Sequence, residues 1–85
     1  MEKITITGTE GNWTFGRLGE YRFEVKHFAE PSEYGLEFDG GPGRISKLWV
    51  TRGYSTVCAY DRGWDKLPAY EEAQDACAEI IRRFN

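Results

Sequence analysis

The sequence predicts an α+β domain in which an antiparallel β-meander of four to five strands packs against one C-terminal α-helix. Three observations predict it. Apolar and polar residues alternate along most of the chain, as strands with one buried face require. Short links containing glycine separate these segments and favour antiparallel hairpins. The C-terminal segment instead carries an apolar stripe of helical period. We expect residues 1–85 to form a single domain, because a chain of 85 residues supports one small core.

Five segments are typical of strands, since β-branched and aromatic residues alternate in them with polar ones. The strictest alternation runs over residues 21–27, where apolar and charged side chains take turns. Trp13 and Phe15 share one face of the strand before it, and we expect both to pack under the helix. A long loop rich in glycine is predicted at 29–43. The expected strands are residues 4–7, 12–18, 21–27, 44–51 and 55–61.

The strand at 44–51 is apolar on both faces. Strict alternation places Ile45 and Trp49 on one face and Leu48 and Val50 on the other. A strand of this kind is usually central in its sheet or covered on both sides. One helix cannot hide all the aromatic side chains of the chain. A second apolar face must therefore be covered by the 29–43 loop, by a second copy of the chain or by a partner.

The helix is predicted from Ala69 or Tyr70 to Phe84. Its apolar residues recur from Ala73 at i+4, i+7, i+8 and i+11, which makes a single stripe facing the sheet. Acidic residues at its start and basic residues at its end suit the helix dipole. The predicted core is Ile4, Ile6, Trp13, Phe15, Phe23, Val25, Leu48, Val50, Val57, Ala73, Cys77, Ile80, Ile81 and Phe84.

Charge and composition disfavour several classes of function. The net charge is -3, from 11 basic and 14 acidic residues mixed along the chain. This is not the basic stripe of a typical nucleic-acid-binding protein, so we expect nucleic acid to be an unlikely partner. No apolar run approaches a membrane span, and the N-terminus lacks the apolar segment of a signal peptide. We therefore expect a cytoplasmic protein that does not bind membranes.

The cysteines and the single histidine do not form a recognisable catalytic or metal site. Cys58 falls in a predicted strand and Cys77 on the inner face of the helix, so two buried free thiols are favoured. The alternative is a disulfide that pins the helix to the sheet. His27 ends a strand and is expected to be an ordinary surface or edge residue. Because these residues lack the spacing of metal ligands, we expect no cofactor and no enzymatic activity.

The candidate binding residues fall in the 44–49 strand and the 60–65 loop. The loop combines tyrosine, arginine and tryptophan, the residue types enriched in interface hot spots. Because the two strands are neighbours, we expect Ile45, Trp49 and Tyr60 to form one exposed patch with Arg62 and Trp64. The alternative is that Trp49 and Trp64 are interior, covered by the 29–43 loop. The candidate partner-binding residues are Arg44, Ile45, Lys47, Trp49, Tyr60, Asp61, Arg62, Trp64 and Asp65.

Three segments carry a resemblance to a known family. They are AEPSEYG at 29–35, GRISKLW at 43–49 and YDRGWD at 60–65. In this order they resemble a family of small uncharacterised proteins from phages, prophages and gut-associated Gram-positive bacteria. The resemblance covers most of the chain. Since that family has no established activity, the resemblance implies a mobile-element origin and a cytoplasmic setting in a host cell, without assigning functional residues.

Two functions are therefore considered. The first is a non-enzymatic, phage- or prophage-derived binding protein, in its most concrete form an inhibitor of a host defence complex similar to an anti-CRISPR protein. It would act by protein–protein contact, with a host or phage protein as partner, and a homodimer is also considered.

The alternative function rests on a second resemblance. Strands followed by Tyr-Asp, a short loop, proline and Glu-Glu-Ala opening a helix look like the plant ethylene-response DNA-binding domain and the arm-binding domains of tyrosine integrases. This implies nucleic-acid binding through the sheet. The acidic composition and the alternating signs of Arg22, Glu24 and Lys26 disfavour it. The residues expected on phosphates are Arg22, Lys26, Arg44, Lys47 and Arg52.

Overall fold

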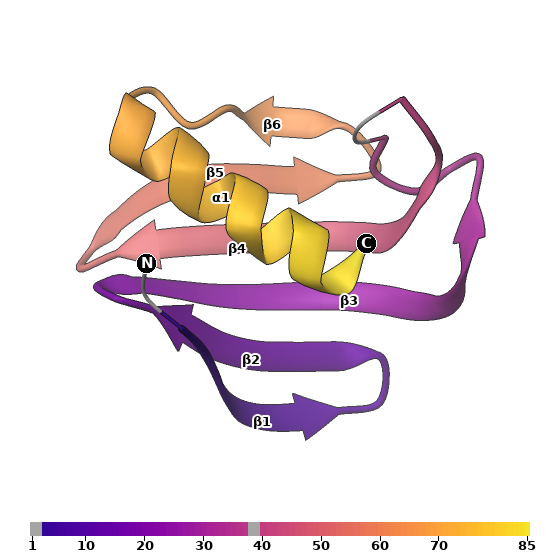
Figure 1. Cartoon of the computed structure of the whole chain (residues 1–85), viewed down its shortest axis with the longest axis horizontal. Coiled ribbons are helices and arrows are strands. Elements are labelled where there is room, and N and C mark those ends of the chain that lie inside the picture. Colours follow the sequence, from indigo (N-terminus) through magenta and orange to yellow (C-terminus); the bar gives the residue numbers. More distant parts are fainter. Residues whose placement is uncertain (1–2, 38–39) are drawn as a thin grey trace.

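One α-helix crosses one face of an antiparallel sheet (Figure 1). The computed structural model describes residues 3–37 and 40–85. Each strand pairs with its neighbour in sequence, in the order β1-β2-β3-β4-β5-β6. The predicted α+β meander is thus confirmed, but in the described residues it has six strands instead of four to five. The elements are β1 (Ile4–Glu10), β2 (Trp13–Leu18), β3 (Tyr21–Ser32), β4 (Gly43–Arg52), β5 (Ser55–Asp61), β6 (Trp64–Lys66) and α1 (Glu71–Phe84).

The additional strand is β6, in a segment that the sequence predicts to be a loop. The chain reverses after β5 at Arg62, whose φ of 54° lies in the left-handed region. The backbone N–H of Asp61 donates to the carbonyl of Gly63 at 2.8 Å and closes this turn. Trp64 then lies opposite Tyr60. A strand of three residues is too short to display an alternating pattern, so its sequence cannot be told from a loop.

The connection between β3 and β4 is shorter than the predicted 29–43 loop. β3 continues to Ser32, which pairs with Gly43 across the sheet. The loop then folds back toward the sheet, because the backbone N–H of Leu36 donates to the carbonyl of Ile45 at 2.8 Å. Leu36 is buried and adds a side chain to the core. Residues 38–39 of the predicted loop lie outside the described part of the chain.

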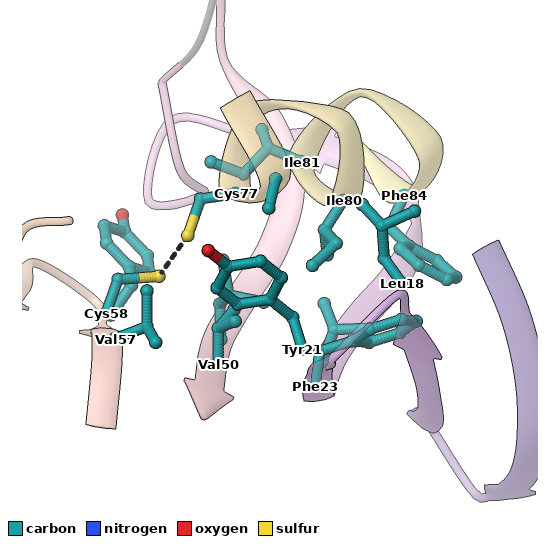
Figure 2. Close-up of a cluster of buried hydrophobic side chains, with 14 of the residues drawn as sticks. Leu18, Tyr21, Phe23, Val50, Val57, Cys58, Cys77, Ile80, Ile81 and Phe84 are labelled. Carbon is teal, nitrogen blue, oxygen red and sulfur yellow. Dashed lines mark hydrogen bonds between the residues drawn. The ribbon is translucent and has the colours of Figure 1, made fainter. Parts of the chain in front are cut away.

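The core fills the space between α1 and the facing side of the central strands (Figure 2). Most of the predicted core is buried there, namely Phe23, Val25, Leu48, Val50, Val57, Ala73, Cys77, Ile80, Ile81 and Phe84. The predicted core omits other buried side chains, which are Leu18, Tyr21, Leu36, Ile45, Tyr60 and Ala76. Cys58 is buried as well, as expected for the two thiols.

The prediction that Trp13 and Phe15 pack under α1 is wrong, because β2 presents its other face to the helix. Thr14 is buried on that face. Gly16 lies opposite Phe23, and a Cβ at Gly16 would come within 2.6 Å of Cζ of the Phe23 ring. The glycine thus makes room for a core aromatic from the next strand. Since side chains alternate along a strand, Trp13 and Phe15 point to the opposite face.

The prediction for the start of the chain is also partly wrong. Ile6 is 44% exposed, whereas Ile4 is half-buried against the edge of the core. Figure 1 shows the reason, since α1 lies over β3, β4 and β5 and leaves β1 beyond its reach. The alternation of isoleucine and threonine correctly predicts a strand. It does not say whether another layer covers that strand.

The predicted faces of β4 fail at one position. Lys26 of β3 lies opposite Lys47, but the next residue, His27, lies opposite Ile45. β4 therefore contains one extra residue at this point, a β-bulge, and the alternation of its side chains changes phase. Ile45 turns into the core, where it is fully buried, while Trp49 stays on the other face. The two side chains were expected to share a face.

Candidate binding surface

The face of the sheet opposite α1, here called the open face, carries aromatic and charged side chains. Its residues are the ones that alternate with the buried residues along β2, β3, β4 and β5. The cross-strand register arranges them in three rows. From one end of the strands to the other, the rows are Arg17–Arg22–Thr51–Thr56, Phe15–Glu24–Trp49–Ala59 and Trp13–Lys26–Lys47–Asp61.

Aromatic rings form the centre of the open face. Trp49 is 46% exposed, and its indole Nε1 donates to Oγ1 of Thr56 at 3.2 Å, which fixes the orientation of the ring. On the other side of Glu24, the rings of Phe15 and Trp13 are nearly parallel, with an interplanar angle of 7° and centroids 6.4 Å apart. These side chains present apolar surface in fixed positions, so a partner would order little more of them on binding.

A shallow groove of about 280 Å³ runs along Trp49 toward the β5–β6 end of the sheet. Its walls include Trp13, Lys47, Asp61 and Asp65. Lys47 Nζ lies 3.9 Å from the Asp61 carboxylate, and both side chains are well exposed. An exposed pair of this kind stabilises a fold by less than about 1 kcal/mol. The groove is thus an apolar floor with a charged rim, which is the usual composition of a protein interface.

Two pairs of cations face each other on the open face. Arg17 lies directly opposite Arg22, and Lys26 directly opposite Lys47. Like charges in directly opposed positions destabilise a sheet by up to about 1 kcal/mol. These pairs therefore have no evident role in folding. Glu24 lies between the two pairs on β3 and partly offsets their charge.

The nine predicted partner-binding residues do not form one surface. Five of them line the groove on the open face, namely Lys47, Trp49, Tyr60, Asp61 and Asp65. Ile45 is fully buried and Tyr60 is 8% exposed, so the expected patch is wrong for both. The cause for Ile45 is the bulge in β4. Tyr60 is buried because it lies opposite Leu48, on the face that α1 covers.

Trp64 and Arg62 belong to a second hollow of about 640 Å³, beside the loop that follows β3. Trp64 is 40% exposed and packs edge-on against Tyr60, with ring centroids 5.2 Å apart. Tyr34 also lines this hollow. The alternative prediction, that Trp49 and Trp64 are interior, is therefore wrong as well. The two tryptophans are both exposed, but they lie in different hollows.

The ninth residue, Arg44, belongs to β4, and its side chain reaches the C-terminal end of α1. Its Nε donates to the backbone carbonyl of Asn85 at 3.2 Å. The Asn85 side chain continues this contact, since Oδ1 accepts from the backbone N–H of Ile45 at 3.2 Å and Nδ2 donates to the carbonyl of Leu36 at 3.0 Å. Arg44 thus helps to fasten the end of the helix to β4. This contact is structural.

His27 belongs to the edge of the core and not to the surface. Its Nε2 forms a hydrogen bond of 3.0 Å with Oγ1 of the buried Thr14, and its ring lies 5.1 Å from that of Phe84. Burial, together with the nearby charges of Arg44 and Arg83, lowers the pKa of His27 below the ordinary 6.5. Within residues 3–37 and 40–85, no group of histidine, cysteine or acidic side chains is arranged to hold a metal ion.

The basic residues expected to contact phosphates are divided among three places. Arg52 instead forms ion pairs with Glu20 at 2.7 Å and Glu72 at 3.6 Å, near the start of α1. Arg44 contacts Asn85, as described above. The remaining three share the open face, and they are Arg22, Lys26 and Lys47. The residues that sequence reasoning did not assign to a binding surface are Trp13, Phe15, Arg17 and Glu24.

The fold and this surface define a small α+β meander domain with one helix-covered face and one open aromatic face. The chain belongs to a family described as a domain of unknown function (DUF7678), which matches residues 12–85. The match runs from β2 through α1 and so includes the open face. No curated protein and no solved structure matches the chain. Among the described residues, no helix is long and apolar enough to cross a membrane.

The family match agrees with the coarser part of the sequence resemblance. Both identify a family whose members have no known function. The open face was not among the residues singled out by the resemblance, since Trp13 and Phe15 lie outside its three segments. The signal that could have found them is Gly16. A glycine inside a strand marks a face where something else approaches closely.

Proposed function

We propose that this protein is a non-enzymatic binding protein that docks the open face of its sheet against a protein partner. The observation that carries the proposal is the position of Trp13, Phe15 and Trp49 on the one sheet face that α1 leaves uncovered. Partly exposed aromatic rings keep apolar surface in water in the free protein. Burial of that surface against a partner is favourable, and aromatic side chains are the usual anchors of such interfaces.

The charges of the open face favour a protein partner over a polyanion. Carboxylates lie among its cations, since Asp61 pairs with Lys47, and Glu24 lies between Arg22 and Lys26 on β3. A phosphate chain laid along the aromatic row would pass close to Glu24 and be repelled. A protein surface can match both signs at once, and such complementarity gives specificity and steers association.

The size of the molecule sets an upper limit on the area of the open face. The molecule measures 31 × 26 Å in the view of Figure 1, in which the sheet lies broadly across the page. This whole outline covers roughly 800 Å², the area that each partner contributes to a standard interface. The most concrete form of the proposal is a phage- or prophage-encoded inhibitor of a host defence complex. Such an inhibitor needs only to occupy a partner's surface.

The test compares Trp49→Ala with a matched control, Tyr34→Ala. Tyr34 is 75% exposed in the second hollow, so its removal should not affect the open face. Each tagged variant is used to capture partners from a lysate of a defence-bearing bacterium, and each is also expressed during phage challenge. The wild type and Tyr34→Ala should retain one stoichiometric protein partner. Trp49→Ala should bind it at least about tenfold more weakly, as expected at a hot spot.

Circular dichroism and thermal melting show whether each variant is folded before it is compared. Recovery of no stoichiometric protein, together with no effect on phage challenge, would refute the proposal. Loss of the partner in Tyr34→Ala but not in Trp49→Ala would move the contact to the second hollow. Sedimentation of the purified chain tests whether the partner is a second copy.

Single-stranded or duplex nucleic acid is a second candidate, favoured by the opposed cation pairs. Arg17 with Arg22 and Lys26 with Lys47 place four positive charges around aromatic rings, the combination that binds phosphates and stacks bases. A gel shift at low salt tests it, with Arg22→Ala as the variant and Arg52→Ala as the control. Binding that weakens with salt and with Arg22→Ala alone would support this candidate. Absence of a shift at tens of micromolar protein would remove it.

A further inference from the structure

Two thiols face each other where α1 crosses the sheet. Cys58 on β5 and Cys77 on α1 have their sulfur atoms 3.0 Å apart (Figure 2), and both side chains are buried. The contact joins residues 19 positions apart in the sequence. The segment between them holds β6 and the connection to α1. Of the described elements, α1 alone covers this face of the sheet, so a bond here would fasten the cover of the core to the sheet beneath.

We propose that Cys58 and Cys77 form a redox-sensitive lock, in which a disulfide formed under oxidising conditions fastens α1 to β5 and its reduction leaves the helix held by packing alone. A disulfide requires sulfur atoms about 2.05 Å apart. The two atoms therefore need to approach by only about 1 Å, which side-chain torsions can supply. This proposal does not depend on the proposed function, since the pair lies on the opposite side of the sheet from the open face.

The reaction balances with a low-molecular-weight disulfide such as oxidised glutathione. One protein thiolate attacks a glutathione sulfur, which forms a mixed disulfide and releases the first glutathione. The second protein sulfur then attacks the protein sulfur of that mixed disulfide and displaces the second glutathione. The protein loses two hydrogen atoms, and one oxidised glutathione becomes two reduced ones. The bonds exchanged are both sulfur–sulfur bonds.

Burial controls how quickly the lock closes. Neither thiol is accessible in the packed structure, so an oxidant reaches them only when α1 moves away from β5. The hydrogen bond with Cys77 and burial both raise the pKa of Cys58, so its thiol is protonated and unreactive while the helix is in place. Molecules with a loosened helix are thus the ones that react. Once formed, the bond would hold α1 down.

The test exposes the purified, fully reduced chain to buffers of increasing oxidised-to-reduced glutathione ratio. Each sample is then quenched by alkylation in denaturant, and the mass of the intact protein is measured by mass spectrometry. We expect the oxidised form to lack two hydrogen atoms and to carry no alkyl groups. Low urea that loosens the helix should speed its formation. The oxidised form should also unfold with an equilibrium constant lowered roughly a hundredfold, as a closed loop of about 20 residues predicts.

The single variants Cys58→Ala and Cys77→Ala serve as controls and should take up glutathione without forming the internal bond. The wild-type chain alone is enough for a decision if either variant fails to fold. Two alkylatable thiols after equilibration in the most oxidising buffer, including a cycle through urea, would overturn the proposal. An internal disulfide that lowers stability would overturn it as well, because the bond would then strain the fold instead of locking it.

Discussion

Two isoleucines with the same prediction have opposite surroundings in the structure. Ile6 and Ile80 both belong to the core that the sequence pattern predicts. Ile80 is fully buried between α1 and the sheet, whereas Ile6 is 44% exposed on β1. Replacing each by alanine removes the same atoms. The difference between the two losses of stability therefore measures burial directly.

The expected losses follow from the atoms removed. Isoleucine to alanine deletes about three carbon groups, which is about 2.4 kcal/mol of transfer free energy at about 0.8 kcal/mol each. At Ile80 a cavity of up to roughly 80 Å³ adds about 2 kcal/mol where the surroundings do not collapse. We expect Ile80→Ala to cost about 2–5 kcal/mol. At Ile6 no layer closes over the side chain, so Ile6→Ala should cost less than about 1 kcal/mol.

Urea denaturation followed by circular dichroism measures both values, with the midpoint and slope fitted together. The loss at Ile80 is a large part of the total, since a chain of 85 residues has roughly 4–13 kcal/mol of stability. Equal losses in the two variants, or a loss below about 1 kcal/mol for Ile80→Ala, would refute the described position of α1 over the sheet. The slope should be unchanged in both.

Three further predictions test the packing around the sheet. Gly16→Ala should destabilise the chain by about 1–3 kcal/mol in urea, because its Cβ would lie 2.5 Å from the backbone oxygen of Thr5 and 2.6 Å from the ring of Phe23. An unchanged midpoint would contradict these contacts. Burial lowers the pKa of His27 in the folded chain, so the unfolded chain binds a proton at His27 more readily than the folded chain does. Stability should therefore fall as the pH drops below about 6.5, and this loss should be smaller in His27→Gln, measured by melting across pH. Asn85→Ala should cost about 1–2 kcal/mol, since its side chain accepts a hydrogen bond from the Ile45 backbone, and hydrogen exchange at that amide should rise.

The sequence by itself was sufficient for the fold class and for the order of all elements except β6. The apolar residues of 21–27 recur with the period of a strand, and those from Ala73 to Phe84 recur with the period of a helix. Neither pattern fits the other type of element, so the two assignments are unambiguous. Short glycine-containing links leave little choice other than a meander. The helix begins at Glu71, within two residues of the prediction, because the acidic and basic ends of the segment mark both its ends.

The candidate site depended on which side of the sheet each side chain takes. Trp13 and Phe15 were expected in the core, and they lie on the open face because Gly16 and not an aromatic residue faces α1. Ile45 was expected on an exposed patch, and it is buried because a bulge in β4 changes the phase of the alternation. Periodicity assigns residues to two faces and does not identify which face is covered.

Only the tertiary structure decided the covering of the two faces and the meeting of distant residues. One helix covers one side of the sheet. An aromatic residue that points to this side is part of the core, and an equally hydrophobic one that points to the other side is part of the binding surface. Cys58 and Cys77 meet for the same reason, because α1 crosses β5 at that point. Local sequence patterns determine whether each segment forms a helix or a strand. The relation between segments depends on packing between residues far apart in the chain, which no local pattern contains.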